Sequence, residues 1–264
     1  MIDPRLGDAL CKRIEDALRS ARRLPLVVGI CGAQGSGKST LAGYLGQRLE
    51  EQGSRVATLS LDDLYKTRAE RQTMARAVHP LFATRGVPGT HDVALGLETI
   101  AALERGGPAP LPRFDKGADD RAPHDTWPLA PAGTQVLLLE GWCVGARPAA
   151  DVSVPVNALE QVEDPQALWR SHANAALAGD YQALFARLDL LVLLAAPGWE
   201  VVARWREQQE AELRQRGGAA VMSPPEVARF IQHYERLTRW ILEEMPARAD
   251  LTVRLGENRE VLSL

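Results

Sequence analysis

The chain has 264 residues with 31 basic and 34 acidic side chains, and this nearly balanced charge gives no support for a nucleic-acid or membrane surface as the main partner. No stretch approaches the roughly 18 consecutive apolar residues of a membrane-spanning helix, and no signal-peptide core precedes the first charged residues, so we expect a cytoplasmic protein. The three cysteines are scattered without a C-x-x-C pair, which argues against a disulfide framework and against a zinc site.

Apolar residues recur every four positions near the N-terminus and predict an amphipathic helix within residues 1–22. Strand patterns follow at 24–31, 55–61, 135–140, 188–195 and 249–255, and the helical patterns include 93–104 and 200–215. Strands that alternate with helices predict a doubly wound α/β fold, a mainly parallel sheet with helices on both faces, which we expect to form a single domain over 1–264. In such sheets ligands bind outside the carboxyl ends of the strands.

The first strand leads into a match to the phosphate-loop pattern G-x-x-x-x-G-K-S/T. Helical spacing begins directly after it, so nucleotide phosphates would meet a helix N-terminus. Lys38 can reach the β- and γ-phosphates, and the Ser39 hydroxyl can ligate Mg²⁺. A chance match in a glycine-rich turn is the alternative. We predict that the nucleotide is bound by Gly32, Ala33, Gln34, Gly35, Ser36, Gly37, Lys38, Ser39 and Thr40.

Carboxylates follow the next two strands. Asp62 and Asp63 leave the second strand beside the phosphate loop, and Asp62 is our candidate base, because an acceptor hydroxyl needs a proton acceptor within reach and kinases commonly use aspartate. The alternative is that the pair caps the following helix, which suits Asp63 best.

Glu140 ends the third strand and can hold Mg²⁺ directly or through waters. A salt bridge without metal is the alternative for Glu140.

Residues 106–133 contain several Pro and Gly without a clear period and predict a long ordered excursion, which is usually functional at this length. Charged residues in it and just before it could bind an anionic acceptor, since Arg can grip a carboxylate with two hydrogen bonds. The candidates are Arg85, His91, Asp92, Arg113, Asp115, Lys116 and Arg121. Ordinary surface charge, loop caps and a structural histidine remain the alternatives.

These motifs resemble the P-loop D-glycerate 3-kinases, which are related to uridine kinase, phosphoribulokinase and pantothenate kinase. The resemblance covers about residues 27–223, and within it residues 112–121 are similar to the uridine-kinase pattern P-x-Y/F-D-x5-R. It implies a P-loop kinase fold that transfers the γ-phosphoryl of ATP, with Mg²⁺, to a hydroxyl of D-glycerate. Asp62 matches the base of that family, Lys38 and Ser39 its phosphate and magnesium residues, and Glu140 its Walker-B-like carboxylate.

The resemblance also implies a helical lid at about 199–224, where Arg204 and Arg206 could neutralise charge on the transferring group. An exposed helix stabilised by i,i+4 pairs with neighbouring glutamates is the alternative. Two other functions stay open, namely a uridine-kinase-like or pantothenate-kinase-like enzyme and a nucleotide-gated or GTP-binding switch protein. The chain has no N-K-x-D guanine motif, which counts against the switch. The oligomeric state is not predicted.

Overall fold

The computed structural model describes residues 2–215 and 222–264. Within them a six-stranded sheet has the order β10-β9-β8-β1-β7-β2. Its strands are β1 (Leu26–Gly32), β2 (Val56–Ser60), β7 (Val136–Gly141), β8 (Leu190–Ala195), β9 (Leu251–Leu255) and β10 (Val261–Ser263). The first five are parallel, and β10 returns antiparallel to β9. The five predicted strands are therefore confirmed, and β10 is an addition that the sequence did not predict.

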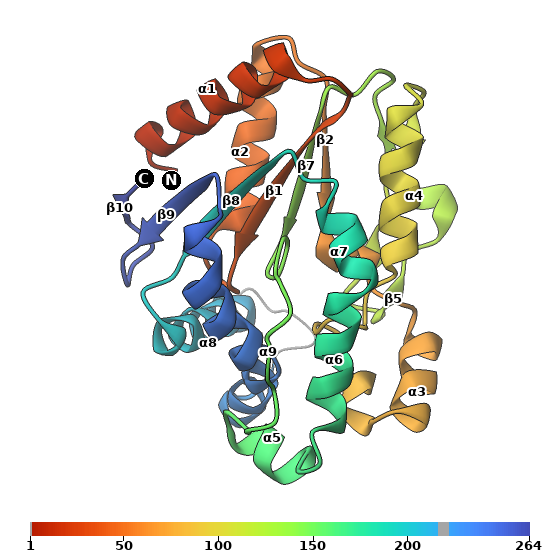
Figure 1. Cartoon of the computed structure of the whole chain (residues 1–264), viewed down its shortest axis with the longest axis vertical. Coiled ribbons are helices and arrows are strands. Elements are labelled where there is room, and N and C mark those ends of the chain that lie inside the picture. Colours follow the sequence, from red (N-terminus) through yellow and green to blue (C-terminus); the bar gives the residue numbers. More distant parts are fainter. Residues whose placement is uncertain (1, 216–221) are drawn as a thin grey trace.

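Helices cover both faces of this sheet, and the predicted doubly wound α/β fold is confirmed (Figure 1). On one side α1 (Pro4–Ser20) packs against α2 (Lys38–Glu51), and both contact β1. On the other side α4 (Val93–Glu104) packs against α7 (Asp180–Phe185). Every residue of β1 and β7 is buried, as expected for central strands covered on both faces.

Five helices gather beyond the carboxyl ends of the strands, in the lower half of Figure 1. They are α3 (Arg68–Ala77), α5 (Ala158–Glu163), α6 (Leu168–Ala178), α8 (Trp199–Gln215) and α9 (Pro224–Glu244). The predicted lid at 199–224 overlaps α8 and the start of α9, and its residues 216–221 lie outside the described part of the chain. In that described part, no helix combines the length and the apolar character that crossing a membrane requires.

The excursion at 106–133 is ordered through two small antiparallel pairs. β3 (Ala109–Pro110) pairs with β6 (Leu129–Ala130), and β4 (Phe114–Asp115) pairs with β5 (Asp120–Arg121). One-turn 3-10 helices complete the described chain at η1 (Leu61–Leu64), η2 (Pro80–Ala83), η3 (His124–Thr126) and η4 (Met245–Ala247). The β4–β5 hairpin reaches the carboxyl ends of the strands, because the Asp63 carboxylate accepts a 3.1 Å hydrogen bond from the Phe114 N–H.

The three cysteines, Cys11, Cys31 and Cys143, are buried and free, which agrees with the absence of a disulfide framework predicted from their spacing. Cys11 lies on the buried face of α1 together with Leu6, Leu10 and Ile14. That face packs into the same hydrophobic core as the sheet, so the N-terminal helix is confirmed as a packing element.

Candidate active site

The phosphate loop joins the end of β1 to α2, which begins at Lys38. Gly35 and Gly37 have φ angles of 78° and 89°, a left-handed conformation that glycine adopts without the clash of a Cβ atom. Close packing excludes a side chain as well, since a Cβ on Gly32 would lie 2.5 Å from the Ser36 hydroxyl oxygen. These glycines therefore allow a tight loop at a helix N-terminus, which is a ready-made site for an anion.

Glu140, at the end of β7, lies beside this loop. The Ser39 hydroxyl donates to one Glu140 carboxylate oxygen at 2.9 Å. The second oxygen, Oε2, is buried with no hydrogen-bond partner among the described residues, and so are the Gln34 side-chain oxygen and the Ser36 hydroxyl. A hydroxyl next to a carboxylate with an unused oxygen fits Mg²⁺, which takes few protein ligands and keeps several waters.

Asp62 lies in η1, directly after β2, and both of its oxygens have partners. The Tyr65 hydroxyl donates to one oxygen at 3.0 Å, and the Lys116 ammonium donates to the other at 2.7 Å. Burial acts to raise the pKa of Asp62, but the positive charges of Lys116 and Lys38 outweigh it and lower the pKa to about 2. Asp62 is therefore ionised at neutral pH and interacts electrostatically with the phosphate-loop lysine.

One cavity of about 980 Å³ connects these groups. It is lined by Lys38 and Ser39 of the loop, by Asp62 and Glu140, and by four further cationic side chains, those of Arg71, Arg85, Lys116 and Arg206. A smaller space of about 130 Å³ extends from Asp62 and Lys116 between Tyr65, Trp142, Phe230 and Tyr234. Strand-end carboxylates, the phosphate loop and the cations thus meet in one place.

Several residues that line this cavity were not predicted from the sequence, and Arg71 and Asp119 are the two that pair with each other. Arg71 on α3 is buried, and its guanidinium donates to the carbonyl oxygens of Lys66, Ala83 and Asp119. The Asp119 carboxylate pairs with Arg71 at 3.0 Å and also with Arg85. No sequence pattern distinguished Arg71 from a surface arginine of an exposed helix. Asp119 has a φ of 54°, a backbone feature that its sequence does not reveal.

Five predicted acceptor residues do not line the cavity. His91 is buried, its Nδ1 lies 2.6 Å from the Tyr181 hydroxyl, and burial lowers its pKa to about 3. Asp92 caps α4 through the Leu95 N–H and pairs with Arg121 at 2.9 Å. Asp115 closes a turn by accepting from the N–H groups of Gly117 and Ala118, and Arg113 pairs with Asp63 at 3.4 Å. In this structure each of the five side chains makes a contact of its own, and none of them lines the cavity.

Of the two predicted lid arginines, Arg206 lines the cavity and Arg204 does not. Arg206 lines the cavity and pairs with Glu210 one helical turn later, so the predicted i,i+4 pair exists without removing this arginine from the site. Arg204 is 58% exposed and pairs with Glu257 at 2.9 Å, away from the cavity. Successive positions on a helix point about 100° apart, so two residues spaced by two cannot both face the same cavity.

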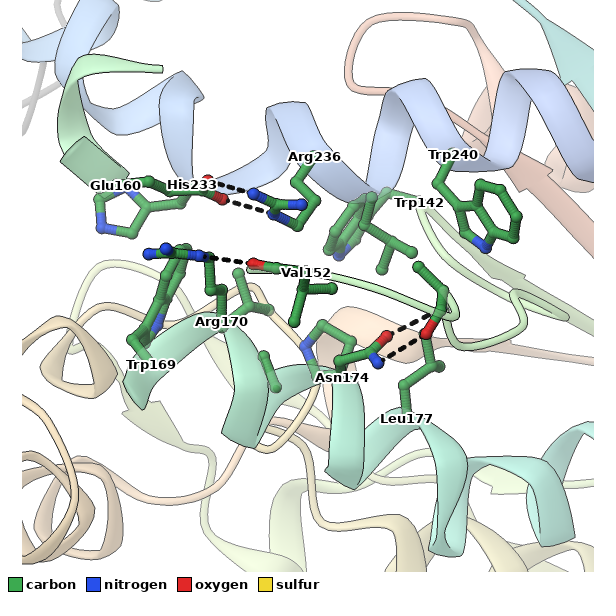
Figure 2. A pocket seen from close by; sticks show the side chains of 15 residues that line it. Trp142, Val152, Glu160, Trp169, Arg170, Asn174, Leu177, His233, Arg236 and Trp240 are labelled. Atoms are coloured by element: carbon green, nitrogen blue, oxygen red, sulfur yellow. Dashed lines mark hydrogen bonds and ion pairs between the residues drawn. The ribbon is translucent and has the colours of Figure 1, made fainter. Parts of the chain in front are cut away.

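A second, smaller cavity lies between α6 and α9, with a volume of about 40 Å³ (Figure 2). Its walls are largely aromatic and aliphatic, with Trp142, Trp169 and Trp240 among them. The guanidinium groups that face it are already paired, Arg170 with Asp164 at 2.9 Å and Arg236 with Glu160. Among the described residues, its lining contains none of the site residues that we predicted from the sequence.

A phosphate loop followed by a helix, with an aspartate and a glutamate at neighbouring strand ends of a doubly wound sheet, is the arrangement of a P-loop phosphotransferase. The family model for "Methylmalonyl Co-A mutase-associated GTPase MeaB" matches residues 8–68. This match includes the phosphate loop and Asp62 but covers less than half of the chain. "Uncharacterized kinase mug58" of Schizosaccharomyces pombe is 37% identical over 239 residues, which are 86% of this chain and 84% of that protein.

"D-glycerate 3-kinase, chloroplastic" of Arabidopsis thaliana is 36% identical over 221 residues, which are 80% of this chain but only 46% of that longer protein. The solved D-glycerate 3-kinase from Cryptococcus neoformans var. grubii superposes with a TM-score of 0.81 at 26% identity, and 98% of each chain is covered. The chain belongs to the P-loop kinase family that contains these proteins and is an ATP-dependent small-molecule kinase.

Proposed function

We propose that this kinase, acting as a single domain over residues 1–264, phosphorylates a hydroxyl of D-glycerate to give 3-phosphoglycerate, with ATP and Mg²⁺. The observation that carries the proposal is the position of Asp62, which shares one cavity with Lys38 and Ser39 and with two cations suited to a carboxylate, Arg85 and Lys116. Further support comes from relatives in Arabidopsis thaliana and Cryptococcus neoformans that carry the name D-glycerate 3-kinase.

Each residue at the nucleotide end has a role that follows from its chemistry. Lys38 and the N–H groups of the loop bind the phosphates of ATP. Ser39 and Glu140 hold Mg²⁺, which neutralises charge on the phosphates when it is bound. Arg206 faces the same cavity from α8 and stabilises the negative charge on the transferring phosphoryl group. Phosphoryl transfer depends mainly on such positioning and electrostatic stabilisation.

At the acceptor end, Asp62 accepts the proton of the attacking hydroxyl. Arg85 and Lys116 bind the acceptor carboxylate, which takes over part of their present pairing with Asp119 and Asp62. The space beside Asp62 has a volume of about 130 Å³. That size suits a three-carbon hydroxy acid better than a nucleoside.

The experiment that tests the proposal is a coupled ADP-release assay with a panel of acceptors. D-glycerate, uridine and pantothenate are each offered with ATP and Mg²⁺ at equal concentration. We expect D-glycerate to give the highest kcat/KM of the three. A preference for uridine or pantothenate would replace the proposed acceptor, and nucleotide binding without turnover of any acceptor would favour the switch protein.

A further inference from the structure

The turn between β9 and β10, residues 256–260, reaches the phosphate loop from the far end of the chain. Its Arg259 donates from Nε to the Gly35 carbonyl oxygen at 2.5 Å. The same guanidinium lies over the Trp205 ring, 5.0 Å from the ring centroid, and donates from Nη1 to the Gln208 side-chain oxygen at 3.0 Å. One arginine thus contacts both the phosphate loop and α8.

The turn and α8 are joined by two further contacts through Glu257. The Trp205 indole N–H donates to the Glu257 carbonyl oxygen at 2.7 Å, and the Glu257 carboxylate pairs with Arg204 at 2.9 Å. The phosphate loop also packs directly on this helix, because a Cβ on Gly35 would lie 2.8 Å from Trp205 Cβ. The loop, the helix and the turn therefore meet at one junction, and Arg204 belongs to that junction instead of the cavity.

The backbone of Arg259 is unusual for its residue type. Its φ is 68°, in the left-handed region that non-glycine residues seldom occupy. Such conformations persist where the surroundings determine them, and they cluster at functional sites. Here the turn is closed by hydrogen bonds from the Gly256 N–H to the Glu260 carbonyl at 2.8 Å and from the Arg259 N–H to the Gly256 carbonyl at 3.0 Å. The closed turn aims the guanidinium at the loop.

Holding one carbonyl oxygen constrains a whole peptide unit. The peptide bond is planar and trans, so its C=O and N–H point in opposite directions. A fixed Gly35 carbonyl therefore fixes the plane between Gly35 and Ser36, and with it the Ser36 N–H, which donates to the Ala33 carbonyl oxygen at 3.2 Å and closes the loop. Anion binding by such loops depends on the directions of successive N–H groups.

We propose that Arg259 is a positioning residue for the phosphate loop. The turn at 256–260 holds the loop in its nucleotide-binding shape against Trp205. This role concerns the nucleotide alone, so it does not depend on which acceptor the enzyme phosphorylates. ADP binding can therefore test it even if the proposed acceptor is wrong.

The test compares Arg259→Ala with Arg254→Ala, which removes an exposed arginine from β9 of the same hairpin. We expect ADP, measured by titration calorimetry with Mg²⁺, to bind Arg259→Ala about tenfold more weakly than wild type, equivalent to about 1.4 kcal/mol. Arg254→Ala should bind ADP as wild type does. Equal ADP affinity in the two variants would overturn the proposal.

Two further readouts separate positioning from general stability. Hydrogen exchange of the loop amides, measured without nucleotide, should be faster in Arg259→Ala than in Arg254→Ala. Arg259→Lys keeps the positive charge but lacks the planar guanidinium that stacks on Trp205 and donates two hydrogen bonds. It should therefore recover only part of the ADP affinity. If Arg259→Ala does not fold, Arg259→Lys decides the matter. ADP binding at least about threefold weaker than wild type supports the proposal, and wild-type affinity overturns it.

Discussion

Replacing Asp62 by asparagine tests whether Asp62 is the catalytic base, with a minimal change in side-chain shape. The substitution keeps the size of the side chain but removes the carboxylate that would accept the proton of the acceptor hydroxyl. It also breaks the ion pair with Lys116, whose side chain is 62% exposed. The Asp62 side chain is only 28% exposed, so water screens the pair in part. A loss of about 1 kcal/mol lowers the melting temperature by about 2–4 °C at this chain length.

The expected effect on catalysis is much larger. Proton transfer by a positioned side chain contributes roughly 10²- to 10⁴-fold to rate, equivalent to about 2.7 to 5.4 kcal/mol of barrier. We therefore expect Asp62→Asn to lower kcat at least about 100-fold while ATP still binds, because Lys38 and the loop are untouched. The two scales differ enough that a loss of stability cannot imitate a loss of the base.

The matched control is the neighbouring Asp63, which anchors the β4–β5 hairpin through the Phe114 N–H and Arg113. Asp63→Asn should shift the melting temperature and leave kcat nearly unchanged. The assay is steady-state ADP release with saturating ATP and D-glycerate, together with thermal unfolding of both variants. The reasoning is refuted if Asp62→Asn keeps near wild-type kcat, or if the two variants exchange their behaviours.

Three other outcomes follow from the same cavity. Lys38→Ala should abolish turnover in a protein that still folds, as circular dichroism would verify, and wild-type turnover would remove Lys38 from the site. Arg85→Ala should raise KM for glycerate by roughly ten- to a hundredfold and change KM for ATP little. The Arg121 side chain pairs with Asp92, so Arg121→Ala should leave KM for glycerate close to wild type. Equal effects of the two substitutions on KM for glycerate would refute this division. The pKa of Asp62, about 2, lies below its usual value, so the carboxylate is protonated only as pH falls toward 2. Wild-type kcat/KM should therefore not decrease through protonation of Asp62 between about pH 4 and 6. Lys116→Met removes one of the charges that lower the pKa of Asp62, so the pH at which kcat/KM begins to fall should rise. An unchanged pH profile would contradict the role of Lys116 in lowering this pKa.

The sequence predicted the fold and the nucleotide half of the site because both depend on local pattern. The apolar run before Gly32 and the helical spacing after Lys38 identify a strand, a loop and a helix in order. Parallel strands share one carboxyl edge, so Asp62 and Glu140 could be expected beside the loop, and the structure has them there. The expected cytoplasmic location stays a prediction.

The acceptor half was harder to predict because it depends on pairing between distant residues. Arg113 and Arg121 resemble Arg85 and Lys116 in sequence, but two of the four pair with carboxylates outside the cavity, Asp63 and Asp92. For Lys116 and Arg121, the path of the β4–β5 hairpin decides which of the two faces the cavity. Arg259 lies 224 positions from its partner Gly35, and no local pattern reports such a contact.

The central claim is phosphoryl transfer from ATP to D-glycerate at this cavity, and identifying the product tests it most directly. Wild-type enzyme is incubated with ATP, Mg²⁺ and D-glycerate, and the products are followed by ³¹P nuclear magnetic resonance. We predict that 3-phosphoglycerate forms in step with ADP and that Asp62→Asn forms it at least about 100-fold more slowly. Release of ADP without any phosphorylated glycerate would contradict the account.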